Sequence, residues 1–268
     1  QVVNTYIKKL NPIFCKNFKT YNINHGFFTR NGGISSQENY SLNCSYSSND
    51  SSDNVLINRQ LICKYFNLKV ANLKTINQIH SNKVKIIHSI NDDTSNIEAD
   101  ALITKSPNII LGILTADCAP ILIQDPLRKI IAAVHIGWKG AYNKILERTI
   151  EELSNLGSDI KNLKLAIGPC IGPASYEVGK DFYLKFTKKN IINKNFFEKI
   201  KLNKYKFDLP KYIYHQAINI GIQAKNISNT NKDTFTDKKN FFSYRRNFIY
   251  KLNDCGRMLS TISMLKTE

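Results

Sequence analysis

Three short apolar runs in the middle of the chain constrain its fold more than any other feature. They are NIILGIL at 108–114, ILIQD at 121–125 and IIAAVHI at 130–136, and the turn segments TADCAP and DPLRK separate them. Runs of this length that are rich in β-branched residues and bounded by turn residues are typical of strands. The pattern predicts a meander of three consecutive strands.

The residues after the third run predict a helix and then a return to strand. The segment AYNKILERTIEELSNLG, at 141–157, places apolar side chains at helical spacing and ends on a glycine. The segment LKLAIG, at 163–168, has a strand pattern and leads into a Gly/Pro-rich turn. A strand, a helix and a second strand in this order predict a β–α–β unit.

The flanking segments contain the same mixture of elements. Residues 51–68 and 209–224 have helical spacing, and 74–80 and 83–90 predict a strand pair interrupted at His80. The aromatic and arginine cluster FFSYRR precedes an apolar tail, MLSTISML. We therefore expect an α/β (α+β) fold in which residues 1–268 form a single domain, a layered sandwich with a mixed central β-sheet and flanking helices.

The formal net charge of +17 would ordinarily point to nucleic acid as a partner. The lysines, however, are spread through segments equally rich in Asn and Ile, such as 185–207, without a zinc-finger spacing or an RNP-like aromatic run. Drift towards AT-rich codons produces this joint enrichment. We expect no nucleic-acid partner, and a basic surface that still attracts small anions such as phosphate.

The sequence carries no signal for a membrane or for export. No stretch of 18 apolar residues occurs, and the first residues lack the layout of a signal peptide. The six cysteines include no CxxC pair, so we expect reduced thiols. These features predict a soluble cytoplasmic protein with no membrane partner.

One cysteine and two histidines stand at the ends of predicted strands. Cys118 lies in the turn TADCAP, His80 closes NQIH, and His135 closes IIAAVH. If these strand ends meet, the three side chains suit a metal ion that keeps a fourth position open. The same residues also suit a thiolate nucleophile with a histidine base, so both interpretations stand.

Two further segments are suited to binding an anion. GWKGA, at 137–141, places Lys139 at a predicted helix start, where free N–H groups favour negative charge. In FFSYRR, Arg245 and Arg246 suit bidentate binding of phosphate or carboxylate, although neighbours on an extended segment point to opposite faces. Asp117, directly before Cys118, is expected to orient a histidine or to carry charge at the site.

Several metalloenzyme classes are disfavoured by spacing. The chain has no HExxH and no HxE with PCxxC, so it lacks the zincin pattern and the usual zinc nucleobase deaminase pattern. With five histidines and no HxH pair, it has too few ligands for a conventional multicopper oxidase.

Six ordered motifs resemble one known family. They are NQIHS, EADALIT, TADCAPIL, AAVHIGWKGA, IGPCIGPASYEVG and FFSYRR, and they span most of the chain. The set resembles the multicopper polyphenol oxidase (laccase) domain family, whose members are also described as purine nucleoside phosphorylases and as peptidoglycan editing factors. The resemblance implies an α/β sandwich in which His80, Cys118 and His135 hold a zinc ion.

The resemblance also implies an activity. The expected reactions are phosphorolysis of adenosine, inosine, guanosine and S-methyl-5′-thioadenosine to a free base and a sugar 1-phosphate, and deamination of adenosine. Lys139 and one of Arg245 and Arg246 are the candidates for holding phosphate. The candidates for contacting substrate or supporting the metal ligands are Asn43, Gln78 and Asp117. Purine nucleosides and phosphate are thus the expected partners of a monomer or homodimer.

Two positions depart from the pattern of the family. Asp233-Thr234 stands where many members have Cys-Thr, so any thiol role at that position is missing. The segment NFIYKLNDC, before Arg257, is longer than the expected turn and leaves the position of Arg257 open.

Three other functions compete with this interpretation. A copper-dependent polyphenol oxidase would hold copper at the same site, although histidines are few. A cysteine hydrolase that edits peptidoglycan precursors would use Cys118 as nucleophile and His135 or His80 as base. A basic binding module without catalysis would leave these three residues unexplained.

Overall fold

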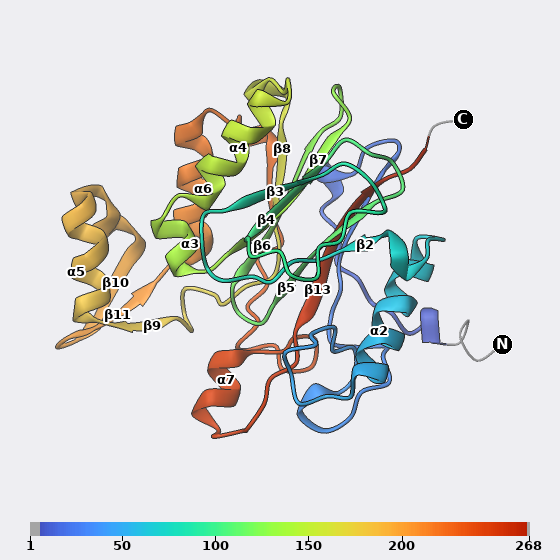
Figure 1. Cartoon of the computed structure of the whole chain (residues 1–268). Helices are drawn as coiled ribbons and strands as arrows, with labels where there is room; N and C mark the ends of the chain where they lie inside the picture. Colours follow the sequence, from blue (N-terminus) through green and yellow to red (C-terminus); the bar gives the residue numbers. More distant parts are fainter. Residues whose placement is uncertain (1–5, 267–268) are drawn as a thin grey trace.

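Two β-sheets stack face to face at the centre of the molecule, and helices cover their outer faces (Figure 1). The computed structural model describes residues 6–266 of the chain. Apolar side chains form one layer between the two sheets and one layer beneath the helices on each side. The α/β sandwich with a mixed sheet and flanking helices is therefore confirmed.

The larger sheet has six strands in the order β12-β8-β6-β7-β4-β3. It is mixed, because β12 runs parallel to β8 and β3 runs parallel to β4, whereas the other neighbours are antiparallel. Its strands are β3 (Val84–Ile87), β4 (Ala101–Thr104), β6 (Ala119–Asp125), β7 (Ile130–Ile136), β8 (Lys164–Ile167) and β12 (Ile227–Asn229).

The central strands β6 and β7 are buried on both faces because their side chains alternate between two apolar layers. Ile121 and Ile123 belong to the layer beneath helices α4 (Ile145–Asn155) and α6 (Leu209–Ile220), whereas Leu122 faces the second sheet. Complete burial of an aliphatic side chain of this size contributes about 1.5–3 kcal/mol. β7 and β8 both run antiparallel to β6, so they are parallel to each other. With α4 between them in the sequence, they form the predicted β–α–β unit, and β6 lies between the two strands in the sheet.

The smaller sheet has four strands in the order β1-β13-β5-β2. Helix α2 (Ser52–Tyr65) covers its outer face, where Leu61 and Ile62 pack with Leu259. Ser51 caps this helix by accepting a hydrogen bond from the Asn54 N–H at 3.1 Å. The strands are β1 (Ile23–Phe27), β2 (Leu73–Lys74), β5 (Ile110–Thr115) and β13 (Met258–Met264).

The three runs predicted as one meander divide between the two sheets, so that expectation is wrong. β6 and β7 form a hairpin, but β5 pairs with β13 and β2 in the smaller sheet. The chain changes sheets at residues 116–118, where Asp117 has a φ of 93°. That left-handed conformation interrupts the extended backbone and lets the turn leave the plane of the first sheet.

The apolar tail is a central strand of the smaller sheet. β13 lies between β1 and β5, and all seven of its residues are buried. Its small polar residues are Ser260, Thr261 and Ser263, and they are interspersed with apolar side chains such as Ile262, which reaches the layer between the sheets. This interleaving conceals the strand from its sequence pattern.

A third sheet and one helix form a lobe at one side of the molecule (Figure 1). Phe182 stacks on Phe186 and Phe197 stacks on Phe207, with ring centroids 4.9 and 4.8 Å apart. The Phe207 ring joins the strands to the helix, because its centroid lies 5.3 Å from that of Phe182 and 5.1 Å from that of Phe186. The elements of the lobe are β9 (Glu177–Gly179), α5 (Lys180–Lys189), β10 (Phe197–Lys201) and β11 (Lys204–Phe207).

Three other expectations about secondary structure need correction. The helix predicted over 141–157 is divided, because the left-handed Lys144, with a φ of 64°, separates α3 (Trp138–Tyr142) from α4. The strand predicted over 74–80 is short, since β2 ends at Lys74 and a loop follows. FFSYRR is not extended, because α7 (Tyr244–Ile249) begins inside it.

Short 3-10 turns connect these elements. The turns are η1 (Lys16–Phe18), η2 (Gln37–Asn39), η3 (Val70–Asn72), η4 (Ile160–Asn162), η5 (Ile191–Phe196) and η6 (Ala224–Asn226).

Over residues 6–266, no helix has both the length and the apolar character that a bilayer crossing requires.

Candidate functional site

The three predicted ligands converge from three different parts of the fold. His80 lies in the loop between β2 and β3, Cys118 in the turn between β5 and β6, and His135 near the end of β7. Their donor atoms all lie within 4.8 Å of one another. His80 is exposed, Cys118 is half-buried and His135 is buried, so the group is open on one side.

This donor set fits a metal ion. One thiolate and two imidazoles are typical ligands of zinc, and three protein ligands leave a position for water or substrate. Gly137 supports the same conclusion, because a Cβ there would lie 2.8 Å from the Cys118 Sγ and 2.9 Å from the His80 Nδ1. Only a glycine leaves the two donor atoms free to approach each other.

Asp100 holds two of the ligands in place. Its Oδ1 lies 2.7 Å from the His135 Nδ1 and accepts a hydrogen bond from the His80 N–H at 3.0 Å. Its Oδ2 accepts hydrogen bonds from the Ser81 N–H and hydroxyl, both at 2.6 Å. A carboxylate that binds the second nitrogen of a ligand histidine fixes the orientation of the ring.

Sequence reasoning missed Asp100 as a site residue. It stands in the motif EADALIT, directly before the buried strand β4, and its side chain is completely buried. An acidic residue directly before the apolar run at 101–103 was the available signal. A buried carboxylate needs partners, and here the partners are the histidine loop and His135.

The charges around His135 favour a cation. Burial lowers the pKa of His135, but the neighbouring Cys118 and Asp100 outweigh burial and raise it to about 9. Burial raises the pKa of Asp100, whereas its hydrogen bonds with His135 and Ser81 lower it, and the net shift is downward. A bound metal ion supplies positive charge at the same place while the imidazole stays neutral.

Asp117 shapes the turn that presents Cys118. Its carboxylate accepts hydrogen bonds from the Thr234 hydroxyl at 2.7 Å, the Ser243 hydroxyl at 3.0 Å and the Arg245 N–H at 2.7 Å. Burial raises the pKa of Asp117, and these hydrogen bonds oppose the shift. The contacts hold the left-handed backbone of the turn and join it to the start of α7.

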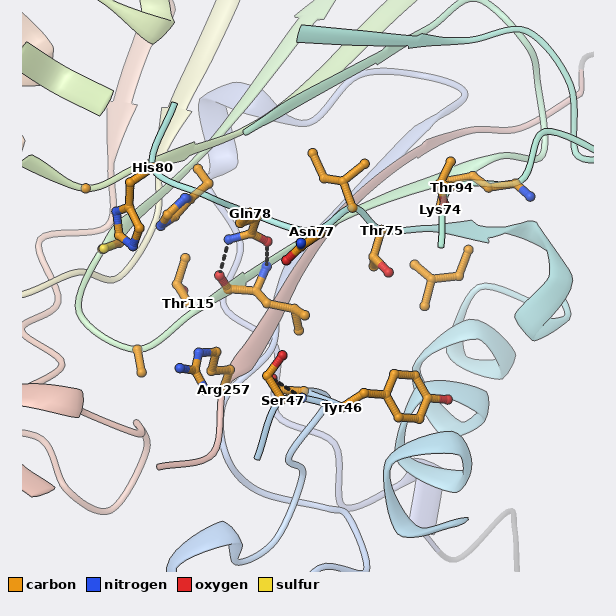
Figure 2. Close-up of a pocket in the computed structure, with 18 of the residues that line it drawn as sticks. Tyr46, Ser47, Lys74, Thr75, Asn77, Gln78, His80, Thr94, Thr115 and Arg257 are labelled. Atoms are coloured by element: carbon orange, nitrogen blue, oxygen red, sulfur yellow. Dashed lines mark hydrogen bonds between the residues drawn. The ribbon is translucent and has the colours of Figure 1, made fainter. Parts of the chain in front are cut away.

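A cavity of about 1170 Å³ opens beside the three ligands. Figure 2 shows His80, Gln78, Thr115 and Arg257 around one part of it. The Gln78 side chain binds both backbone groups of Leu114, at 2.7 and 2.8 Å, and so ties the histidine loop to β5 (Figure 2). Gln78 therefore lines the cavity while most of its amide is already engaged.

Three cationic side chains line the cavity close to the ligand group. Lys139 belongs to the short helix α3, Arg245 to α7, and Arg257 directly precedes β13. The Arg245 guanidinium lies 5.4 Å from the centre of the Tyr176 ring and donates to the Glu177 carbonyl at 2.8 Å. Arg257 lines the cavity even though the segment that precedes it, NFIYKLNDC, is longer than the expected turn.

Thr115 contributes a hydroxyl group to the wall of the cavity. The residue is 2% exposed, and its Oγ1 has no hydrogen-bond partner among residues 6–266. Buried polar atoms are usually paired, so this hydroxyl is available to a ligand.

Two of the predicted site residues lie outside the cavity wall. Asn43 is completely buried, and its Oδ1 accepts the Arg257 N–H at 3.0 Å and the Ser45 N–H at 3.1 Å, so it acts on the cavity through these two lining residues. Arg246 is buried and donates to the carbonyls of Thr234, Phe235 and Phe241. Because α7 is a helix, Arg245 and Arg246 point in different directions, and only Arg245 reaches the cavity.

Asp233 links two loops instead of offering a thiol. Its carboxylate accepts hydrogen bonds from the Gly172 N–H at 3.1 Å and from the Ser175 hydroxyl. The following residue, Thr234, binds Asp117. The Asp233-Thr234 pair therefore supports the walls of the site without contacting the three ligands.

The comparisons with known proteins agree with the motifs. The family model described as multi-copper polyphenol oxidoreductase laccase matches residues 24–265. A purine nucleoside phosphorylase of Rickettsia conorii is 35% identical over 221 residues, 81% of this chain and 81% of that protein. A purine nucleoside phosphorylase of Rickettsia prowazekii is 36% identical over 197 residues, 72% of this chain and 75% of that protein.

A solved structure has the same fold. The hypothetical protein YfiH of Bacillus licheniformis superposes with a TM-score of 0.84 at 28% identity, covering 91% of this chain and 93% of that chain. The family that the motifs resemble is thus confirmed by both sequence and fold. This chain belongs to the family described as multi-copper polyphenol oxidoreductase laccase.

Proposed function

We propose that this chain is a metal-dependent purine nucleoside phosphorylase that also deaminates adenosine. The observation that carries the proposal is the convergence of His80, Cys118 and His135 at the wall of a cavity that cationic side chains also line. The names of the Rickettsia relatives support the same activity. The proposed substrates are adenosine, inosine, guanosine and S-methyl-5′-thioadenosine, each with phosphate.

Zinc is the metal that we propose for the site. His80, Cys118 and His135 would hold it, and a zinc ion supplies Lewis acidity and lowers the pKa of water. Copper is the alternative, as the description of the family implies. The five histidines of the chain argue against the larger ligand set of a multicopper centre.

Phosphorolysis needs a phosphate held next to the sugar. The bond from C1′ to the base nitrogen breaks, a bond from C1′ to a phosphate oxygen forms, and the departing base takes the electron pair and a proton. Lys139, Arg245 and Arg257 would hold the phosphate dianion, because their positive groups line the cavity near the ligand group. The same charges stabilise the negative charge that develops on the departing base.

The remaining residues position these groups. Asp100 orients His135, Asp117 shapes the turn of Cys118, and Gln78 ties the histidine loop to β5. The free Thr115 hydroxyl would bind the sugar or the phosphate. Deamination of adenosine requires in addition that water adds to C6 of the purine and ammonia leaves from it.

Incubation of the purified protein with inosine, with and without phosphate, tests the proposal. We expect hypoxanthine and ribose 1-phosphate to form in equal amounts and only when phosphate is present. Hypoxanthine release that is independent of phosphate would exclude phosphorolysis. Adenosine incubated without phosphate should give inosine and ammonia. Metal analysis of the same sample should find one zinc per chain, and stoichiometric copper with phenol turnover would favour the oxidase.

One observation favours a second candidate function, a cysteine hydrolase acting on peptidoglycan precursors. Cys118, His135 and Asp100 are ordered as a nucleophile, a base and an orienting carboxylate. Alkylation by iodoacetamide separates the two roles. If Cys118 is a ligand, bound metal protects it and a chelator exposes it. Rapid alkylation without chelator, together with full activity of metal-free protein, would establish the nucleophile.

The broader expectations from the sequence stay predictions. We propose that residues 1–268 act as one catalytic domain, as a monomer or homodimer in the cytoplasm, without a nucleic-acid or membrane partner. The shared apolar layer between the two sheets supports the single domain.

A further inference from the structure

The cavity extends past the ligand group to a second positively charged region. Its far part is lined by Arg59 from α2, Thr75 from the loop after β2, and Tyr46. Figure 2 shows Tyr46 and Thr75 on the side of the cavity away from His80. Nothing in the proposed phosphorolysis uses this region.

Arg59 is a buried cation without a carboxylate partner. Its side chain is 8% exposed, and within residues 6–266 no Asp or Glu forms a salt bridge with it. Its Nε donates to the Cys44 carbonyl at 2.9 Å, and its Nη1 donates to the Thr75 hydroxyl at 3.0 Å. Neither of these hydrogen bonds uses Nη2.

The surroundings of Arg59 compensate its charge incompletely. The guanidinium carbon lies 4.5 Å from the centre of the Tyr46 ring, a cation–π contact. Burial lowers the pKa of Arg59, because it takes water away from the guanidinium. A buried charge ordinarily has a counter-ion, so an anion bound from the cavity would supply the missing partner.

A second cation lies next to this region. Lys74 is buried, and its Nζ donates to the Ile90 carbonyl at 2.6 Å and to the Asp92 carbonyl at 2.8 Å. Asp92 and Asp93 also line the far part of the cavity, but they are less buried than Lys74, and one oxygen of each accepts N–H groups of their own loop. The buried charges there are therefore positive.

We propose that Arg59, Thr75 and Lys74 form a subsite for a phosphate monoester dianion, in addition to the proposed phosphate site beside the metal ligands. Thr75, Asn77, Gln78 and His80 line the cavity in sequence, so the subsite and the metal ligands open into the same cavity. A purine nucleoside 5′-monophosphate would then bind with its sugar towards His80 and its 5′-phosphate at Arg59. The choice of a nucleoside rests on the proposed function; the phosphate subsite does not.

Isothermal titration of the full-length holoprotein with three probes tests the subsite. The probes are inosine, inosine 5′-monophosphate and inorganic phosphate alone. We expect the wild-type protein to bind the monophosphate about tenfold or more tightly than inosine, as one charge-assisted hydrogen bond provides. In Arg59→Gln this difference should disappear while the affinity for inosine stays within about twofold.

Two further variants separate binding from folding. Thr75→Val keeps the shape of the side chain but removes the hydroxyl, and it should weaken binding of the monophosphate by a few-fold without changing the affinity for inosine. Arg148→Gln removes an exposed arginine that pairs with Glu151 and Glu152, and it should leave all three affinities unchanged.

The outcomes distinguish the sources of phosphate. If the monophosphate binds more tightly than inosine and the difference depends on Arg59, the subsite holds a phosphate that is carried by the substrate. If inorganic phosphate binds in an Arg59-dependent way but the monophosphate binds no more tightly than inosine, the subsite holds free phosphate. Equal loss of inosine and monophosphate affinity in Arg59→Gln, or no Arg59-dependent phosphate binding, would overturn the proposal. If inosine is never cleaved but Arg59-dependent binding persists, only the proposed function fails.

Discussion

The Oδ1 of Asp100 lies 2.7 Å from the Nδ1 of His135. The same carboxylate accepts hydrogen bonds from the backbone of His80 and Ser81, so one buried side chain fixes a strand residue and a loop residue together. The His80 loop has a left-handed backbone, with a φ of 59° at His80 itself. Asp100 is therefore the group on which the geometry of the ligands most depends.

Replacing Asp100 with Asn should weaken metal binding although Asp100 is not itself a ligand. The amide has one acceptor oxygen where the carboxylate has two, so the hydrogen bonds to His135 and Ser81 cannot both be kept. We expect metal affinity to fall by about 10- to 100-fold and stability by about 2–3 kcal/mol. Competition with a chromogenic chelator measures the affinity; an unchanged value would exclude this role for Asp100.

Gly137→Ala should block the ligand group without unfolding the protein. The new Cβ would lie 2.8 Å from the Cys118 Sγ, which forces the donor atoms apart. Gly179→Ala is the matched control, because both glycines precede helices with similar φ angles of −86° and −83°, and nothing lies within 4 Å of a Cβ at Gly179. Metal analysis should find loss of metal in the first variant only. Metal retained in Gly137→Ala would contradict the close approach.

The two adjacent arginines should respond differently to substitution. Arg246→Gln removes hydrogen bonds to buried carbonyls and should cost about 3 kcal/mol of stability. Arg245→Gln removes a half-buried group at the cavity, so it should raise the KM for phosphate with a stability change below about 1 kcal/mol. Urea unfolding and phosphate-dependent kinetics on both variants check the contrast. The reverse pattern would show that Arg246 serves the substrate.

Thr115→Val should leave the free protein as stable as before, or more stable by up to about 1 kcal/mol. The buried hydroxyl has no partner among residues 6–266, so its removal takes away no hydrogen bond there. If the hydroxyl binds substrate, kcat/KM for inosine should nevertheless fall by about tenfold, a loss of about 1.4 kcal/mol. Stability and kinetics that are both unchanged would remove Thr115 from the site.

His25 should make stability fall in mild acid. Burial, with a smaller effect from Lys19, lowers its pKa from 6.5 to about 4. Between those values the unfolded chain binds the proton and the folded protein does not, so this stability is complete above pH 6.5 and is lost as pH falls towards 4. A shift of this size corresponds to about 3 kcal/mol.

His25→Gln tests this pH dependence while keeping an acceptor for the Cys15 N–H. Its unfolding free energy should fall less than that of the wild-type protein between pH 6.5 and 4, in urea titrations of metal-free samples. His88→Gln, an exposed histidine, is the control and should follow the wild-type curve. Identical slopes in all three proteins would exclude His25 as the source.

Local patterns were sufficient for most helices and for the central strands. The runs at 121–125 and 130–136 are buried at every position and mostly apolar because β6 and β7 are covered on both faces, so their composition alone indicates buried strands. The strand β13 was not recognised, since Ser260, Thr261 and Ser263 are small enough to be buried between apolar neighbours. Burial of such residues depends on neighbours that a linear pattern does not reveal.

The sequence by itself determined the residue types of the site, His80, Cys118 and His135, and their places at the ends of apolar runs. Tertiary structure decided which neighbours serve them. Asp100 holds the ligands through its hydrogen bonds, and the Thr115 hydroxyl faces the cavity without a partner among residues 6–266. Arg246 lies on the side of α7 that faces buried carbonyls, outside the cavity wall. Spacing along a chain fixes which atoms are available, but only packing fixes the directions in which those atoms point, and coordination and hydrogen bonding depend on direction.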